Sequence, residues 1–170
     1  MRGSIPSDHP RCLNKRILVI GLGNPERSDD GAGLAIARRL QVRAPDCVRV
    51  EQSGGDIMSL LETWRGFDDV ILIDAMKSND PPGQFRWFDV STCDIPEQVF
   101  PEHSTHTFGL YQAVAMARAL GELPRNTHVV GVQGGNFAAG STLSVEVERA
   151  VEAVVASVLE RLSALEVAHA

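Results

Sequence analysis

ILVIGLGNPERSDDGAGLAIARRL, residues 17–40, decides how the rest of the chain folds. Its first four residues are apolar, which is typical of a buried parallel strand, and they lead into Gly21 and Gly23. Glycines after a strand permit backbone angles closed to other residues and let a partner approach the main chain closely. Two adjacent acids, Asp29 and Asp30, then lead into a helical pattern of small residues. The stretch predicts a strand, a sharp loop that faces a ligand, and a helix.

The glycine pair begins the G-x-G-x-x-G pattern of dinucleotide sites, and Glu51, at the end of the next strand, stands where an acid could bond a ribose. The match fails at its third glycine, because Glu26 stands there. Acidic residues in this loop put negative charge where a pyrophosphate needs the backbone amides of a helix N-terminus. A phosphate-binding P-loop is excluded because no Gly-Lys-Ser/Thr follows. A loop that presents carboxylates suits a metal ion or a general acid or base better than a phosphate.

Composition predicts one compact domain. The 170 residues, of which 44% are hydrophobic, fit a single domain over residues 16–165 that follows a flexible tail over residues 1–15. The net charge of -6, without a lysine or arginine cluster longer than a pair, argues against a nucleic-acid or membrane-surface partner. No apolar run reaches the roughly 18 to 20 residues of a membrane span, and the first residues lack the apolar core of a signal peptide.

The three cysteines, Cys12, Cys47 and Cys93, are odd in number and show no C-x-x-C spacing. We therefore expect neither a disulfide framework nor a cysteine zinc site. This pattern is typical of a reducing compartment, so we expect a cytoplasmic protein.

Hydrophobic periodicity predicts strands that alternate with helices. The predicted strands are 17–20, 48–51, 70–73, 84–90 and 129–133, and the predicted helices are 30–43, 57–64, 107–120 and a long terminal helix after residue 144. The run 70–73 is the most hydrophobic, so we expect it at the centre of the sheet, and 84–90 has the alternation of an edge strand. The fold class is α/β: a single-domain, doubly wound, mostly parallel five-stranded sheet with helices on both faces.

Ligands of such sheets bind beyond the C-terminal ends of the strands. The acidic loop, Asp74 after the central strand, and the glycines after the last strand all fall at that edge. One of Asp29 and Asp30 can cap the following helix while the other faces the cleft. His106, at the start of a helix, feels the positive end of the helix dipole, which favours a neutral imidazole that can bind metal; His103 competes with it. Two carboxylates and one imidazole form a site with open positions that zinc, nickel or iron accept.

Several other kinds of hydrolytic site are absent from the sequence. It contains neither a G-x-S-x-G nucleophile elbow nor the Asp-Thr-Gly or Asp-Ser-Gly signature of pepsin-type proteases. If hydrolysis occurs at this edge, an activated water is the expected nucleophile, polarised by a metal or by a carboxylate that acts as base.

The order and spacing of these motifs resemble those of the hydrogenase maturation proteases, endopeptidases that trim a C-terminal peptide from the precursor of the nickel-iron hydrogenase large subunit. The resemblance covers about residues 16–163. It rests on Gly21-Leu22-Gly23-Asn24, Ser28-Asp29-Asp30-Gly31-x-Gly33, Ser53-Gly54-Gly55-Asp56, Ile73-Asp74-Ala75, Ser104-Thr105-His106-x-x-Gly109-Leu110 and Gly131-Val132-Gln133.

The resemblance implies that Asp30, Asp74 and His106 are both the catalytic and the metal-binding residues. It further implies that the metal is nickel carried by the substrate, with no permanently bound cofactor, and that the partner is the large-subunit precursor. Thr105 stands where some members have proline, which leaves a choice between His106 and His103, and Gly134 likewise replaces a proline found in some members.

Two other functions stay open at this point. The first is a dinucleotide-binding oxidoreductase that uses Gly21, Gly23 and Glu51. The second is a non-enzymatic chaperone that holds the unprocessed precursor in the same cleft.

Overall fold

The computed structural model describes residues 15–95, 105–140 and 142–167, with the side chains of 105–108 and 166–167 left out. The elements in chain order are β1 (Ile17–Leu22), the 3-10 helix η1 (Ser28–Gly31), α1 (Ala32–Leu40), β2 (Val48–Ser53), α2 (Ile57–Trp64), β3 (Asp69–Met76), β4 (Phe85–Asp89), α3 (Thr105–Leu120), β5 (Asn126–Gln133) and α4 (Val145–Val167). The predicted tail over 1–15 lies almost wholly outside the described residues, so the predicted domain boundary stays a prediction.

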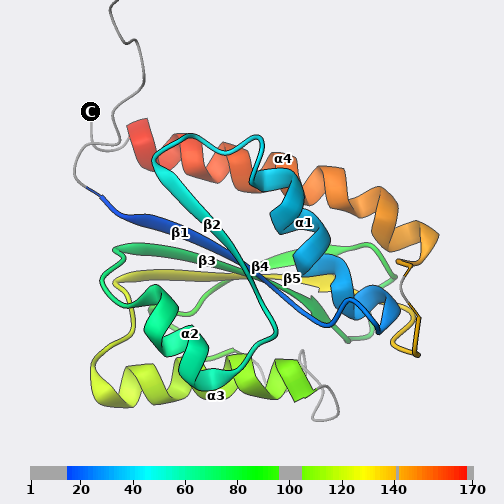
Figure 1. The fold of residues 1–170 in the computed structure, drawn as a ribbon, viewed down its shortest axis with the longest axis horizontal. Coiled ribbons are helices and arrows are strands. Elements are labelled where there is room, and N and C mark those ends of the chain that lie inside the picture. Colours follow the sequence, from blue (N-terminus) through cyan, green and yellow to red (C-terminus); the bar gives the residue numbers. More distant parts are fainter. Residues whose placement is uncertain (1–14, 96–104, 141, 168–170) are drawn as a thin grey trace, which may run out of the picture.

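The five strands form one sheet in the order β2-β1-β3-β5-β4. Neighbouring strands are parallel except β4, which runs antiparallel to β5 at one edge. Helices α1 and α4 cover one face of the sheet, and α2 and α3 cover the other (Figure 1). The predicted fold class is confirmed, as are the central position of the third strand and the edge position of the fourth.

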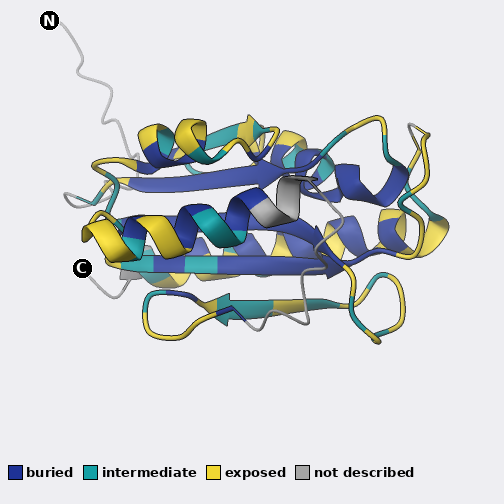
Figure 2. Cartoon of the chain, turned by 90° about the horizontal axis from the view of Figure 1, so that it is seen from below, coloured by how far each residue is buried: buried dark blue, intermediate teal, exposed yellow. Residues whose placement is uncertain are grey.

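Alternation along the strands supplies an apolar face to each helical layer. In β3 all eight residues are buried, and successive side chains point to opposite faces. Leu72 and Met76 pack with α2 and α3, whereas Ile71 and Ile73 pack with α1 and α4. The result is a sheet buried between two apolar layers, with exposed residues confined to outer helix faces, loops and edge strands (Figure 2).

Several element boundaries differ from the sequence-based ones, and three of them show how polar residues extend or interrupt the apolar pattern. The predicted helix over 30–43 is split into η1 and α1, and α1 ends at Leu40. Strand β3 continues two residues beyond Asp74. Strand β5 begins three residues earlier than expected, because Asn126 pairs with Asp69 of β3 and donates a side-chain hydrogen bond of 2.8 Å to it. Periodicity does not detect strand ends that are stabilised by polar pairs.

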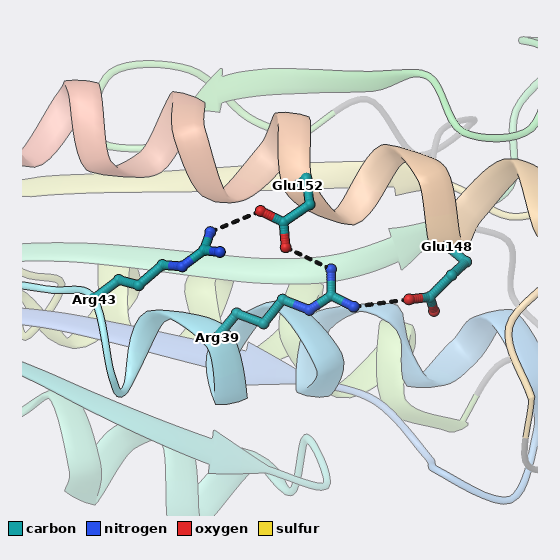
Figure 3. A network of polar contacts seen from close by, with 4 residues as sticks. All are labelled: Arg39, Arg43, Glu148 and Glu152. Carbon is teal, nitrogen blue, oxygen red and sulfur yellow. Dashed lines mark hydrogen bonds and ion pairs between the residues drawn. The ribbon is translucent and has the colours of Figure 1, made fainter.

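Helices α1 and α4 are also joined by a surface ion-pair network (Figure 3). Arg39 lies between Glu148 and Glu152, at 2.7 and 2.8 Å, and Arg43 contacts Glu152 at 2.7 Å. Because all four side chains are a third exposed or more, solvent screens these pairs and each adds little to the stability. The network orients the two helices, while the apolar layer beneath them supplies most of the stability.

The cysteines depart from expectation. Cys47 is disulfide-bonded, a bond that the expectation of no disulfide framework did not foresee. Spacing along the chain does not show which cysteines the fold brings together, because pairing depends on distance in space. Cys93 is free and exposed. The cytoplasmic location inferred from cysteine spacing stays a prediction, and no described helix is long and apolar enough to cross a membrane.

Candidate active site

The glycines after β1 permit a close approach to their backbone, and the group that approaches is another part of the same chain. A Cβ atom on Gly23 would lie 1.8 Å from the carbonyl oxygen of Asp30, and one on Gly21 would lie 2.2 Å from that of Gly33. Gly23 also has φ of +141°, in the region that favours glycine. These glycines seat η1 and the start of α1 against the end of β1, while the expectation that the loop faces a ligand stays a prediction.

A third glycine fixes this seat against the central strand as well. A Cβ atom on Gly33 would lie 2.3 Å from the carbonyl oxygens of both Leu22 and Ile73. The start of α1 thus rests on the ends of β1 and β3 together. Because Asp30 lies three residues before Gly33, this packing brings the turn that carries it to Asp74 on β3.

Asp29 and Asp30 have different surroundings although they are adjacent. Neither η1 nor α1 has a side-chain cap, so the expected capping of the following helix by one of the acids is wrong. Asp29, fully buried, instead accepts hydrogen bonds from groups more than 100 residues away, at Gly135, Asn136 and Ser144. Asp29 is therefore the structural member of the pair.

Asp30 and Asp74 form a buried acidic pair. Asp30 is 1% exposed, and its Oδ2 accepts a hydrogen bond of 3.2 Å from the amide of Asn24. Asp74 is 0% exposed, and its Oδ1 accepts a bond of 2.8 Å from the amide of Ala75. Its Oδ2 has no hydrogen-bond partner among the described residues. These two carboxyl groups thus lie together in a buried position, as the sequence predicts for Asp30 and Asp74.

The electrostatics of the pair follow from its burial. Loss of solvent raises the pKa of Asp74 well above its ordinary value, the negative charge of Asp30 raises it further, and the Ala75 amide partly opposes both. Two buried carboxylates repel each other, and a bound cation relieves that repulsion. The arrangement is therefore suited to a proton or a metal ion.

His106 is the second residue of α3, which begins two residues earlier than predicted. The start of α3 packs on the loop after β2, because a Cβ atom on Gly109 would lie 2.1 Å from the carbonyl oxygen of Gly55. This loop follows the C-terminal end of a parallel strand, so the start of α3, which includes His106, lies at the C-terminal edge of the sheet (Figure 1). The side chain of His106 and all of His103 lie outside the described residues. Among described side chains no group of three metal-ligating residues occurs.

Two further polar residues at this edge had no role assigned from the sequence. Oε1 of Gln133, at the end of β5, accepts hydrogen bonds from the amide and hydroxyl of Ser78 at 2.8 and 2.7 Å, and its Nε2 donates to the carbonyl of Gly134. Gln133 is buried and joins the loops after β3 and β5. The sequence does contain a signal for Gln133, because this residue is polar and ends an otherwise apolar strand.

The dinucleotide alternative loses its supporting residues. The glycines Gly21 and Gly23 are covered by the chain's own backbone. Glu51 is paired with Arg49 at 2.6 Å on the same strand. These contacts leave neither the glycine loop nor the acid in the arrangement that a bound dinucleotide requires.

Comparison with known proteins agrees with this geometry. A family model described as hydrogenase maturation protease matches residues 34–161. The chain is 30% identical over 151 residues to the hydrogenase 2 maturation protease of Escherichia coli, covering 86% of this chain and 90% of that protein. It is similar to the solved structure of the hydrogenase maturating endopeptidase HybD from Escherichia coli, with a TM-score of 0.74, 29% identity, and coverage of 87% and 92% of the two chains. It is also similar to the [NiFe] hydrogenase maturation protease HybD from Thermococcus kodakarensis, with a TM-score of 0.67, 29% identity, and coverage of 86% and 98%. The chain therefore belongs to the hydrogenase maturation proteases, a family of endopeptidases.

Proposed function

We propose that this endopeptidase removes a C-terminal peptide from the nickel-loaded precursor of a nickel-iron hydrogenase large subunit. In this proposal Asp30, Asp74 and His106 ligate nickel that arrives with the substrate. The protein itself needs no permanently bound metal, because the ion belongs to the precursor that it recognises.

The single observation that carries the proposal is the buried acidic pair. Asp74 has an oxygen without a hydrogen-bond partner among the described residues, and the charge of Asp30 acts on it. An ionised, buried carboxylate without compensation is costly, and a neighbouring like charge adds to the cost. A divalent cation offsets that cost for both groups, so a loaded precursor would bind in preference to an empty one.

The same carboxylates can supply the chemistry. An ionised carboxylate within hydrogen-bond reach of a water can take its proton as that water attacks the peptide carbonyl. Carboxylate and imidazole together are ordinary ligands of transition metals, and two or three such ligands leave positions open for a substrate group. His106 is assigned here because its backbone lies at the same edge of the sheet, at the start of α3.

The experiment is mass spectrometry of the large-subunit precursor from the same organism, prepared with and without nickel. Each precursor is incubated with the wild-type chain, with Asp30→Asn, with Asp74→Asn and with His106→Gln. Glu62→Gln removes an acid from an exposed position on α2 and serves as the control. We expect loss of a short C-terminal peptide only from the loaded precursor, and only with the wild-type and control chains.

Other outcomes discriminate the alternatives. A complex that forms without cleavage would indicate a chaperone. Cleavage of precursor that lacks nickel would contradict the metal requirement. Cleavage by His106→Gln would remove His106 from the site and direct attention to His103. Saturable quenching of tryptophan fluorescence by micromolar NAD(H), without any cleavage, would restore the oxidoreductase alternative.

A further inference from the structure

The turn that carries the acidic pair is hydrogen-bonded to the segment that follows β5, which we call segment 134–140. The amide of Asp29 donates to the carbonyl of Asn136 at 2.9 Å, and the amide of Ser28 donates to that of Gly140 at 2.6 Å. The amide of Gly140 in turn donates to the carbonyl of Glu26 at 2.9 Å. Two loops more than 100 residues apart in the sequence are thus joined backbone to backbone.

The side chain of Asp29 forms the centre of this connection. Its Oδ2 accepts hydrogen bonds from the amides of Gly135 and Asn136, both at 2.8 Å, and from the hydroxyl of Ser144 at 2.9 Å. Its Oδ1 accepts from the amide of Ser144 at 2.6 Å. A carboxylate that accepts four bonds in a fully buried position holds its donors more firmly than a neutral acceptor can. Asp29 therefore fixes both ends of the loop between β5 and α4.

Segment 134–140 is exposed although its backbone is fixed. Residues 135, 136 and 138–140 are exposed, Phe137 is half-buried and Gly134 is buried. The Phe137 ring lies against Gly134, where an added Cβ atom would lie 2.5 Å from it. The segment continues from β5, which pairs with β3 at Asp74. It therefore forms a mostly exposed rim, in which five of the seven residues are glycine or alanine, at the edge where the acidic pair lies.

We propose that Asp29 is a positioning residue that holds segment 134–140 as a preformed wall for the peptide chain of the substrate. The inference rests on the proposed function and adds to it a residue that acts on substrate binding rather than on the reacting atoms. A wall already in its bound arrangement binds a flexible tail without a further ordering cost. Small side chains on the rim leave room for an extended peptide to approach its backbone.

The location of Asp29 separates its effect from that of Asp30. Asp30 is held by the amide of Asn24 and by the close packing at Gly23, neither of which involves the Asp29 carboxylate. Loss of the Asp29 side chain therefore releases segment 134–140 before it displaces the acidic pair. The expected effect is a higher KM for the precursor with little change in kcat.

The test compares Asp29→Asn, Ser144→Ala and Val151→Ala with the wild-type chain. Asp29→Asn keeps the size of the side chain but replaces one acceptor oxygen by a donor that faces other donors. Ser144→Ala removes one of the four bonds and leaves the Ser144 amide in place. Val151→Ala destabilises the buried face of α4 without touching Asp29, so it reports the effect of lost stability alone.

We expect Asp29→Asn to raise KM for the nickel-loaded precursor about tenfold and to leave kcat within about threefold, with Ser144→Ala intermediate. Hydrogen exchange gives a readout that needs no activity: the amides of residues 135, 136 and 144 should exchange at least about tenfold faster in Asp29→Asn. Val151→Ala should change neither KM nor the relative protection of these amides.

Three results would overturn the inference. The first is unchanged exchange at these amides in Asp29→Asn, which would show that the side chain does not hold the segment. The second is a fall in kcat at constant KM, which would place Asp29 in the chemistry. The third is an unchanged KM in Ser144→Ala if Asp29→Asn fails to fold. A wild-type chain that neither binds nor cleaves the precursor would instead overturn the proposed function, and faster exchange in Asp29→Asn would then support the anchoring role alone.

Discussion

Replacing Gly33 by alanine tests the packing that forms the site. In an open helix this change stabilises by about 0.5–1 kcal/mol, because glycine loses more backbone entropy on folding. Here the new Cβ atom would lie 2.3 Å from two carbonyl oxygens, on Leu22 and Ile73, where ordinary contact begins at 3.4 Å. Both oxygens belong to buried strands, so relief requires α1 to move by about 1 Å.

Overpacking of this kind costs about 1–3 kcal/mol or more, which exceeds the gain in helix propensity. We expect Gly33→Ala to lose about 2 kcal/mol of unfolding free energy, which lowers Tm by about 4–8 °C in a chain of this size. A shift of about 1 Å in η1 also moves Asp30 from Asp74, and misplacement of that size can reduce the rate of the chemical step about 100-fold.

Urea denaturation followed by circular dichroism measures the stability, and precursor cleavage at a temperature where the variant is folded measures the rate. Gly54→Ala is the matched control, because no atom lies within 4 Å of its added Cβ, and its stability should stay within about 0.5 kcal/mol of wild type. A Gly33→Ala chain as stable as wild type, or more stable, would refute the seating of α1 on β1 and β3.

Three further substitutions have defined outcomes. Burial, followed by the neighbouring acid, raises the pKa of Asp74, so the native state favours its protonated form, and stability is lost as pH rises through that pKa. Asp74→Asn should therefore be more stable than wild type at pH 7, by an amount that vanishes at acid pH, in urea titrations at several pH values, while cleavage is lost. Burial, followed by Arg161, lowers the pKa of His128, whose ring contacts the Arg161 guanidinium at 2.6 Å. The native state therefore favours the neutral imidazole of His128. The stability this gives is present above the ordinary pKa of histidine and is lost as pH falls through the lowered pKa of His128 in the native state. His128→Gln should flatten the dependence of Tm on pH between about 7 and 5. Arg39→Ala removes two ion pairs at the surface between α1 and α4, and it should shift the urea midpoint only slightly, with most of the shift abolished by 1 M salt.

The fold could be predicted because its main signal is local. Alternate residues of β3 point to opposite faces of the sheet, and the continuous apolar run 70–73 by itself indicates a strand that is buried on both faces. The ends of the strands could not be predicted, because they depend on pairs such as Asn126 with Asp69 that are distant in sequence. The same holds for the disulfide of Cys47.

The site could be predicted only in part, and the glycine loop shows why. Its sequence indicates that something approaches Gly21 and Gly23 closely, but not that the partner is the chain's own first helix. Adjacent acids pose the same difficulty, since the partners of Asp29 lie more than 100 residues away. Asp30 and Asp74 are brought together as expected, whereas the place of the His106 side chain stays a prediction.

Asp29 and Asp74 are both fully buried, yet only one of them has the donors that a carboxylate needs. Four hydrogen bonds surround Asp29, which makes its charge a stabilising part of the loop that it holds. Asp74 has one oxygen bonded to the next amide and faces a second acid, so its environment penalises ionisation. An amide side chain at position 74 would relieve that penalty, and an acid that persists where it lowers stability is the pattern expected of a residue retained for chemistry. The contrast between these two acids supports both proposals, that Asp29 anchors the loop and that Asp74 acts together with Asp30.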